Sequence, residues 1–77
     1  MTDQETIQTA CDLYGVSLHD FDGRNAKRGQ RATMLPVKAR RLACKAFYAK
    51  GYTKAKIARL VGLSGASPVR YLITGKR

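Results

Sequence analysis

Apolar residues in this chain recur every three or four positions, in segments that end at glycines, and nowhere alternate with polar residues over a useful length. A spacing of three and four places apolar side chains on one face of an α-helix, whereas a half-buried β-strand needs strict alternation. Glycine readily adopts the left-handed conformation that closes many helices. The pattern therefore predicts an all-α domain of four or five short helices.

The first expected helix covers residues 3–14 and is followed by a short helical turn near Ser17. Thr2 and Glu5 fit a capping box, and Gly15 is suited to end the helix. The apolar stripe of this helix consists of Ile7, Ala10, Cys11 and Tyr14. Val16, Leu18 and Phe21 are the apolar anchors of the turn that follows.

Three more helices are expected in the rest of the chain. A long helix over residues 35–51 has Pro36 in its first turn and an apolar stripe formed by Ala39, Leu42, Ala43, Ala46 and Phe47. A third helix begins after the N-cap Thr53 and ends at Gly62, and a last one runs from Pro68 to Ile73, with Ser67 as its cap. We expect one domain over residues 1–77: an acidic N-terminal helix and turn (1–22), a basic loop (23–34), the long helix (35–51) and a helical pair (53–75).

The charges change sign once along the chain. All five acidic residues lie in residues 1–22, and all fifteen lysines and arginines lie in residues 23–77. The net charge of +10 makes a domain of 77 residues repel itself, so an anionic partner is expected. Nucleic acid is the first candidate and an anionic membrane surface the second. Binding to a membrane surface needs a helix with a bulky apolar face flanked by lysine, whereas the apolar positions of this chain indicate a small globular core.

Other classes of protein find little support in the composition. No apolar run approaches the roughly 18 residues of a membrane span, and the polar N-terminus does not have the pattern of a signal peptide, so a cytoplasmic, nucleoid-associated protein is expected. Cys11 and Cys44 are expected to be small buried hydrophobic residues. One histidine and two scattered cysteines do not suggest a metal site, and no motif suggests an enzyme, a cofactor or a small-molecule substrate.

The most informative stretch is "YTKAKIARLVGLSGASPVRYL", residues 52–72. Ile57 and Val61 would face the core, Ala58 would allow the next helix to cross closely, and Gly62 would make the turn. This is the pattern of a helix-turn-helix, whose second helix enters the major groove of duplex DNA. An αα-corner without a ligand has a similar pattern. The unmixed positive charge on the pair favours DNA binding.

Taken together, the chain resembles the carboxy-terminal duplex-binding domain of the bacterial replication initiator DnaA, with a corner also similar to that of the Trp repressor. "IQTACDLYGVSLHDF" is similar to the first helix of that domain, "GRNAKRGQR" to its basic loop, "KARRLACKAF" to its long helix and "KIARLVG" to its Glu-Ile-Gly-x-x-Phe-Gly segment. The chain has no P-loop, so the resemblance does not extend to the initiator's ATPase part.

The resemblance implies two contacts with DNA. The basic loop of the family puts an arginine into the minor groove, and the candidates for this role are Arg24, Lys27, Arg28 and Arg31. The recognition helix of the family opens with Arg-Asp-His-Thr, whereas this chain has Ser64, Gly65, Ala66 and Ser67, followed by Pro68. The resemblance therefore implies that this chain has the helical scaffold of the family but not its specificity for origin boxes.

The residues themselves suggest which side chains contact DNA. Ser64, Ala66, Ser67 and Arg70 are the candidates for base contacts, although Arg70 is equally suited to a phosphate and the serines to helix capping. The remaining candidates, expected on phosphates, are Lys54, Lys56, Lys76 and Arg77.

We therefore expect sequence-specific double-stranded DNA binding by a small transcriptional regulator, such as a phage or mobile-element gene encodes, with RNA polymerase or another regulator as a possible protein partner. One alternative is an accessory factor at a replication origin, and another is an RNA-binding protein. An alternative of another class is an adaptor that docks on a partner protein through residues 3–14. Burial of the apolar stripe of that helix would make it structural, and exposure would make it a docking face.

Overall fold

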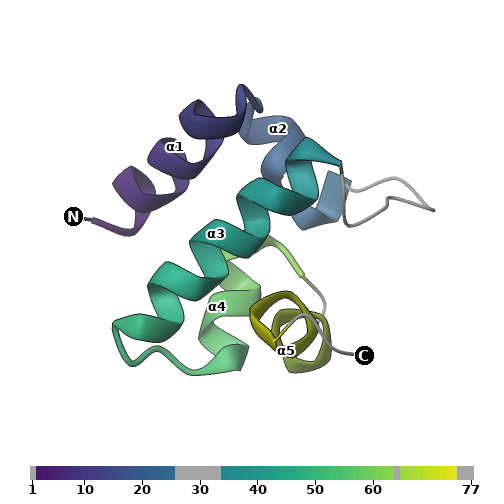
Figure 1. The fold of residues 1–77 in the computed structure, drawn as a ribbon. Coiled ribbons are helices and arrows are strands. Elements are labelled where there is room, and N and C mark those ends of the chain that lie inside the picture. The colour runs from purple at the N-terminus through teal and green to yellow at the C-terminus, as the bar shows by residue number, and fades with distance from the viewer. Residues whose placement is uncertain (1, 26–33, 64, 75–77) are drawn as a thin grey trace.

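The chain folds into short helices packed around one long helix (Figure 1). The computed structural model describes residues 2–25, 34–63 and 65–74. In these ranges lie five α-helices and one short 3₁₀ helix: α1 (Asp3–Tyr14), α2 (Leu18–Phe21), η1 (Gly23–Asn25), α3 (Leu35–Ala49), α4 (Lys54–Val61) and α5 (Ala66–Thr74). No strand occurs in these ranges, so the predicted all-α class is confirmed.

Several helix ends match the sequence expectations. The hydroxyl of Thr2 accepts a hydrogen bond from the Glu5 amide at 3.1 Å, and that of Thr53 accepts one from the Lys56 amide at 3.2 Å. Gly15 and Gly62 close α1 and α4 with φ values of +64° and +78°. Each of these ends depends on residues only a few positions apart, which explains why the sequence predicts them well.

The start of α5 differs from the prediction. The helix begins at Ala66 and not at Pro68, so Ser67 lies within its first turn, and the predicted cap at Ser67 is wrong. The first N–H groups of a helix have no intrahelical acceptor. Pro68 is the third residue of α5, where its missing N–H costs no hydrogen bond. The helix can therefore begin two residues before the proline.

The core lies where α1, α4 and α5 pack against α3. Its fully buried side chains include Phe47 and Cys44 of α3, Ile57 and Val61 of α4, and Val69 of α5. On α1, Ala10 and Cys11 are buried, and Ile7 and Tyr14 pack against the same core. The predicted apolar stripe of this helix is therefore structural, and it is not a free docking face. Leu13, on another side of the helix, is 66% exposed.

Both cysteines are free and buried, as expected for small hydrophobic residues. Burial raises the pKa of the Cys44 thiol to about 12, although the nearby Arg40 opposes the shift. Burial and, to a smaller extent, the charge of Asp12 also raise the pKa of Cys11. Both side chains are therefore neutral thiols at physiological pH, where a thiolate would be needed for nucleophilic chemistry.

Arg40 is a basic residue whose side chain lies inside the domain and not on its surface. Its side chain is only 4% exposed. Its Nε donates a hydrogen bond to the Phe21 carbonyl at 2.7 Å, and one Nη donates to the Asp20 carbonyl at 3.4 Å. Burial lowers the pKa of Arg40, while Cys44 and Asp22 oppose that shift. Arg40 therefore joins α2 to α3 inside the domain and cannot contact DNA.

Candidate nucleic-acid interface

The candidate interface is built on the pair α4–α5 and the turn between the two helices. Ile57, Ala58 and Val61 bury one side of α4, and Val69 and Leu72 bury one side of α5. At the turn, the amides of Gly62 and Leu63 donate to the Ala58 carbonyl, the latter at 2.8 Å. The structure thus contains the predicted helix, glycine turn and helix, and leaves the opposite sides of both helices facing solvent.

The outer side of α5 carries the candidate base-reading residues. Ala66, Arg70 and Thr74 are exposed and lie four residues apart, so they form one stripe opposite the buried Val69 and Leu72. The Thr74 hydroxyl donates to the Arg70 carbonyl at 2.8 Å. Ser67 lies in the first turn of the same helix. Ala66 and Arg70 are therefore brought together, whereas Ser64, Lys76 and Arg77 lie outside the described residues.

Lysines surround the N-terminal end of α4. Lys54 and Lys56 lie in its first turn, where an acidic residue would interact favourably with the helix dipole and a lysine does not. Aromatic rings lie beneath both ammonium groups: Lys54 Nζ is 5.4 Å from the Tyr48 ring centroid, and Lys56 Nζ is 4.2 Å from that of Tyr52. The positive end of the helix dipole and two supported lysines together make this helix end attractive to an anion such as phosphate.

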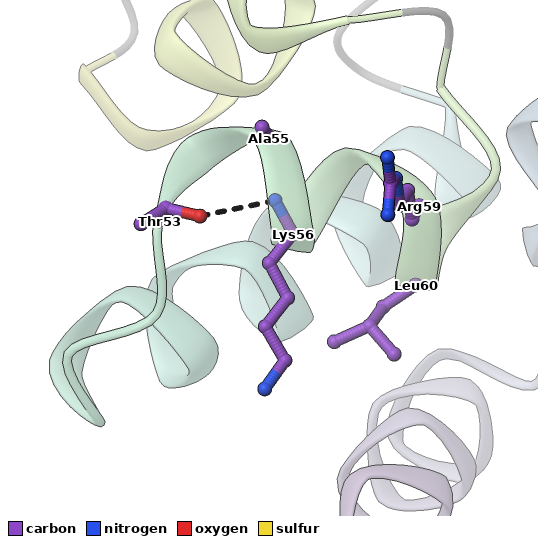
Figure 2. Close-up of a pocket in the computed structure, with 5 residues that line it drawn as sticks. All are labelled: Thr53, Ala55, Lys56, Arg59 and Leu60. Carbon is purple, nitrogen blue, oxygen red and sulfur yellow. Dashed lines mark hydrogen bonds between the residues drawn. The ribbon is translucent and has the colours of Figure 1, made fainter.

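A shallow hollow of about 520 Å³ opens on the outer side of α4 (Figure 2). Lys56 and Leu60 extend from the same side of the helix, and the dashed line marks the Thr53–Lys56 capping bond (Figure 2). The hollow is lined by Thr53, Ala55, Lys56, Arg59 and Leu60. Arg59 is exposed here, so it belongs with the candidate phosphate-contacting residues although its side chain was not among the predicted set.

Arg24 reaches the interface through a contact that the sequence does not predict. The Asp22–Gly23 segment packs directly on the Gly62–Leu63 turn, so closely that a Cβ on Gly23 would lie 2.8 Å from the Gly62 carbonyl oxygen. The Arg24 amide donates to the Asp22 carboxylate at 2.9 Å. Arg24 is exposed beside the α4–α5 turn, whereas Lys27, Arg28 and Arg31 of the predicted basic loop lie outside the described residues.

Sequence patterns do not predict the packing of Gly23 against Gly62, because the two residues lie about forty positions apart in the chain. The only local signal is the Asp22-Gly23 dipeptide, which indicates a turn and does not indicate what the turn contacts.

The lysines and arginines of the interface are not neutralised by the protein. Among the described residues, Arg24, Lys54, Lys56, Arg59 and Arg70 form no ion pair with a carboxylate. The same part of the chain contains no cluster of three or more metal-ligating side chains, and no helix in it is long and apolar enough to cross a membrane. The surface offers positive charge and a few small side chains, which suits binding to a polyanion.

Comparisons with protein-family models, with curated proteins and with solved structures found no match for this chain.

Proposed function

We propose that this chain binds duplex DNA, with α5 in the major groove and with α4 and Arg24 on the flanking phosphates. The observation that carries the proposal is the exposed Ala66–Arg70 stripe on α5, next to a turn flanked by unpaired cations from α4 and η1. A helix presenting small residues and one arginine can approach base edges closely. The surrounding lysines and arginines would supply phosphate contacts and most of the affinity.

Salt dependence is the first test of this proposal. If about 6 to 8 cations contact the backbone, the affinity for a fluorescently labelled duplex falls on the order of 10³-fold or more between 50 and 200 mM salt. Fluorescence anisotropy over a salt series measures this change. An affinity that is nearly independent of salt would rule out the proposed mode of binding.

Matched variants separate the roles of individual side chains. Lys54→Ala and Lys56→Ala should each weaken binding to all duplexes and lower the slope of log affinity against log salt by about 1.

Arg70→Ala should reduce the preference for a selected duplex by about 1–3 kcal/mol if Arg70 reads a guanine, and should only lower the slope if it contacts phosphate. Thr9→Glu is the charge-matched control, because it lowers the net charge by the same one unit at an exposed position of α1, a helix that packs on α3 and α2. An equal loss in the control would contradict the assigned surface.

The biological role we propose is that of a small transcriptional regulator. Selection of bound duplexes from a random library, followed by footprinting, tests this role. Protection of a promoter supports it, and protection of repeated boxes at a replication origin would instead favour an accessory replication factor.

A further inference from the structure

A second group of cations lies away from α4 and α5, in a groove where the end of α1 meets α3. The groove has a volume of about 280 Å³ and is lined by Tyr14, Lys38, Arg41, Leu42 and Lys45. Lys38, Arg41 and Lys45 are spaced by three and four residues and therefore lie along one side of α3. None of the three was among the residues expected to contact a ligand.

The positive charge of this groove is not compensated within the described structure. Lys38, Arg41 and Lys45 form no ion pair and no side-chain hydrogen bond there. Asp12, two residues before Tyr14 on α1, accepts a hydrogen bond from Gln8 at 2.8 Å and does not line the groove. Like charges three or four residues apart on a helix repel each other. An anion in the groove would remove this repulsion.

Arg41 gives the most specific signal. Its Nε is buried and has no hydrogen-bond acceptor among the described residues. A buried donor without an acceptor is unfavourable, and native proteins contain few of them. The guanidinium group is thus held at the groove without an internal partner, and its planar set of donors matches the oxygen atoms of a phosphate.

We propose that the α1–α3 groove binds a phosphate group, carried either by a free nucleotide or by a nucleic-acid backbone. The Arg41 guanidinium donates to the phosphate oxygens after a small rotation that also gives Nε an acceptor, and Lys38 and Lys45 flank the anion. Tyr14 and Leu42 supply an apolar wall for the adjoining sugar or base. The volume is near the lower end of ligand pockets, about 300–1,000 Å³, which suits one phosphate with a small attached group. This site uses α1 and α3 and does not depend on duplex binding by α4 and α5.

Nuclear magnetic resonance of the full chain tests the site directly. The Arg41 Nε–H signal is assigned by its disappearance in Arg41→Lys, and inorganic phosphate, adenosine monophosphate and a short DNA duplex are then titrated separately. We expect a saturable shift of the Arg41 signal. Arg41→Lys keeps the charge but loses the two-pronged donor set, so amide shifts of the groove should report an affinity lower by about tenfold or more. Lys50→Arg, an exposed exchange of the same two residue types at the C-terminal end of α3 and outside the groove lining, should bind phosphate and the mononucleotide as the unchanged protein does.

The outcomes separate the two ligand sources and the two proposals. A shift with phosphate or the mononucleotide supports a free ligand, and a shift with the duplex alone supports a nucleic-acid backbone. A shift with phosphate in a protein that does not bind the duplex leaves the groove site standing while the proposed function fails. No shift of the Arg41 signal with any probe overturns the inference, as does unchanged affinity in Arg41→Lys. Lys45→Gln, an exposed change, provides a second variant whose weaker binding is expected and whose unchanged binding would also count against the site.

Discussion

At the scale of single residues, this molecule depends on backbone positions that only glycine fits. Gly62 combines a positive φ with a close neighbour, because a Cβ there would collide with the side chain of Asp22 and lie 3.1 Å from the Gly23 nitrogen. Gly15 has a similar φ but open space around it. The first glycine therefore serves both the turn and the packing of α2–η1, whereas the second serves only the end of a helix.

This pair of glycines allows the two effects to be measured separately. Gly15→Ala should lower the free energy of unfolding by about 1–2 kcal/mol, the usual cost of left-handed backbone for an L-residue. Gly62→Ala should cost about 2–4 kcal/mol, because the collision with the Asp22–Gly23 segment adds to the same backbone cost. Urea denaturation of both variants measures the difference. Equal losses would show that the Gly23–Gly62 contact is not tight in solution.

At the scale of helices, Tyr52 connects three elements. Its hydroxyl donates to the Asp3 carboxylate of α1 at 2.7 Å, its ring stacks on Phe47 of α3 with centroids 5.6 Å apart, and Lys56 of α4 lies over the ring. The hydrogen bond to Asp3 is the main cause that raises the pKa of Tyr52 above the ordinary value of 10.0, with burial and the charge of Asp3 adding to it. Tyr52 thus fastens the first turn of α1 to the connection between α3 and α4.

The raised pKa makes this connection sensitive to alkaline pH. A group whose pKa is higher in the folded state stabilises the fold fully below its unfolded pKa and loses that contribution as the pH rises through the folded pKa. For Tyr52 the loss should begin near pH 10.0. Tyr52→Phe should be less stable than the unchanged protein at neutral pH and should lose less stability at alkaline pH.

Urea denaturation at a series of pH values checks this behaviour. The two buried thiols also weaken the fold as they ionise, but they are present in both proteins and so cancel in the comparison. Parallel curves of unfolding free energy against pH for the two proteins would show that the hydrogen bond to Asp3 does not raise the pKa of Tyr52 in solution.

At the scale of the whole molecule, the dominant feature is a net charge of +10 on a small domain. One cation, Arg40, is internal, and the cations of the α4–α5 surface and of the α1–α3 groove have no carboxylate partner among the described residues. Such a molecule is held together by its apolar core against mutual repulsion of its charges. Anions in solution should therefore stabilise the fold.

Salt should have opposite effects on folding and on DNA binding. Raising sodium chloride from about 0.05 to 0.5 M shortens the screening length several-fold and should stabilise the free protein by on the order of 1 kcal/mol, or about 4–8 °C in Tm. Lys45→Glu, which lowers the net charge from +10 to +8, should show a smaller increase. Circular dichroism melting curves measure both. A Tm that falls with salt would mean that attraction between the acidic N-terminal segment and the basic remainder outweighs the repulsion.

The sequence predicts the elements of this fold better than it predicts the contacts between them. The caps at Thr2 and Thr53 and the ends at Gly15 and Gly62 depend on neighbours within one helical turn. The burial of Arg40 and the approach of Gly23 to Gly62 depend on segments that are far apart along the chain. The predicted start of α5 is wrong because a helix accepts proline at any position of its first turn, so the sequence is compatible with a start at Ala66 or at Pro68.

The same division holds for the candidate sites. Composition and spacing alone determined that this chain forms short amphipathic helices and carries an unopposed positive charge, because helix formation and net charge follow from local hydrogen bonding and from counting. Only the tertiary structure decided that Arg40 lies inside, that Arg24 stands beside the α4–α5 turn and that Arg41 faces a groove. Whether a basic side chain such as Arg40 is buried depends on which distant segment packs over it, and the local spacing of residues does not encode that choice.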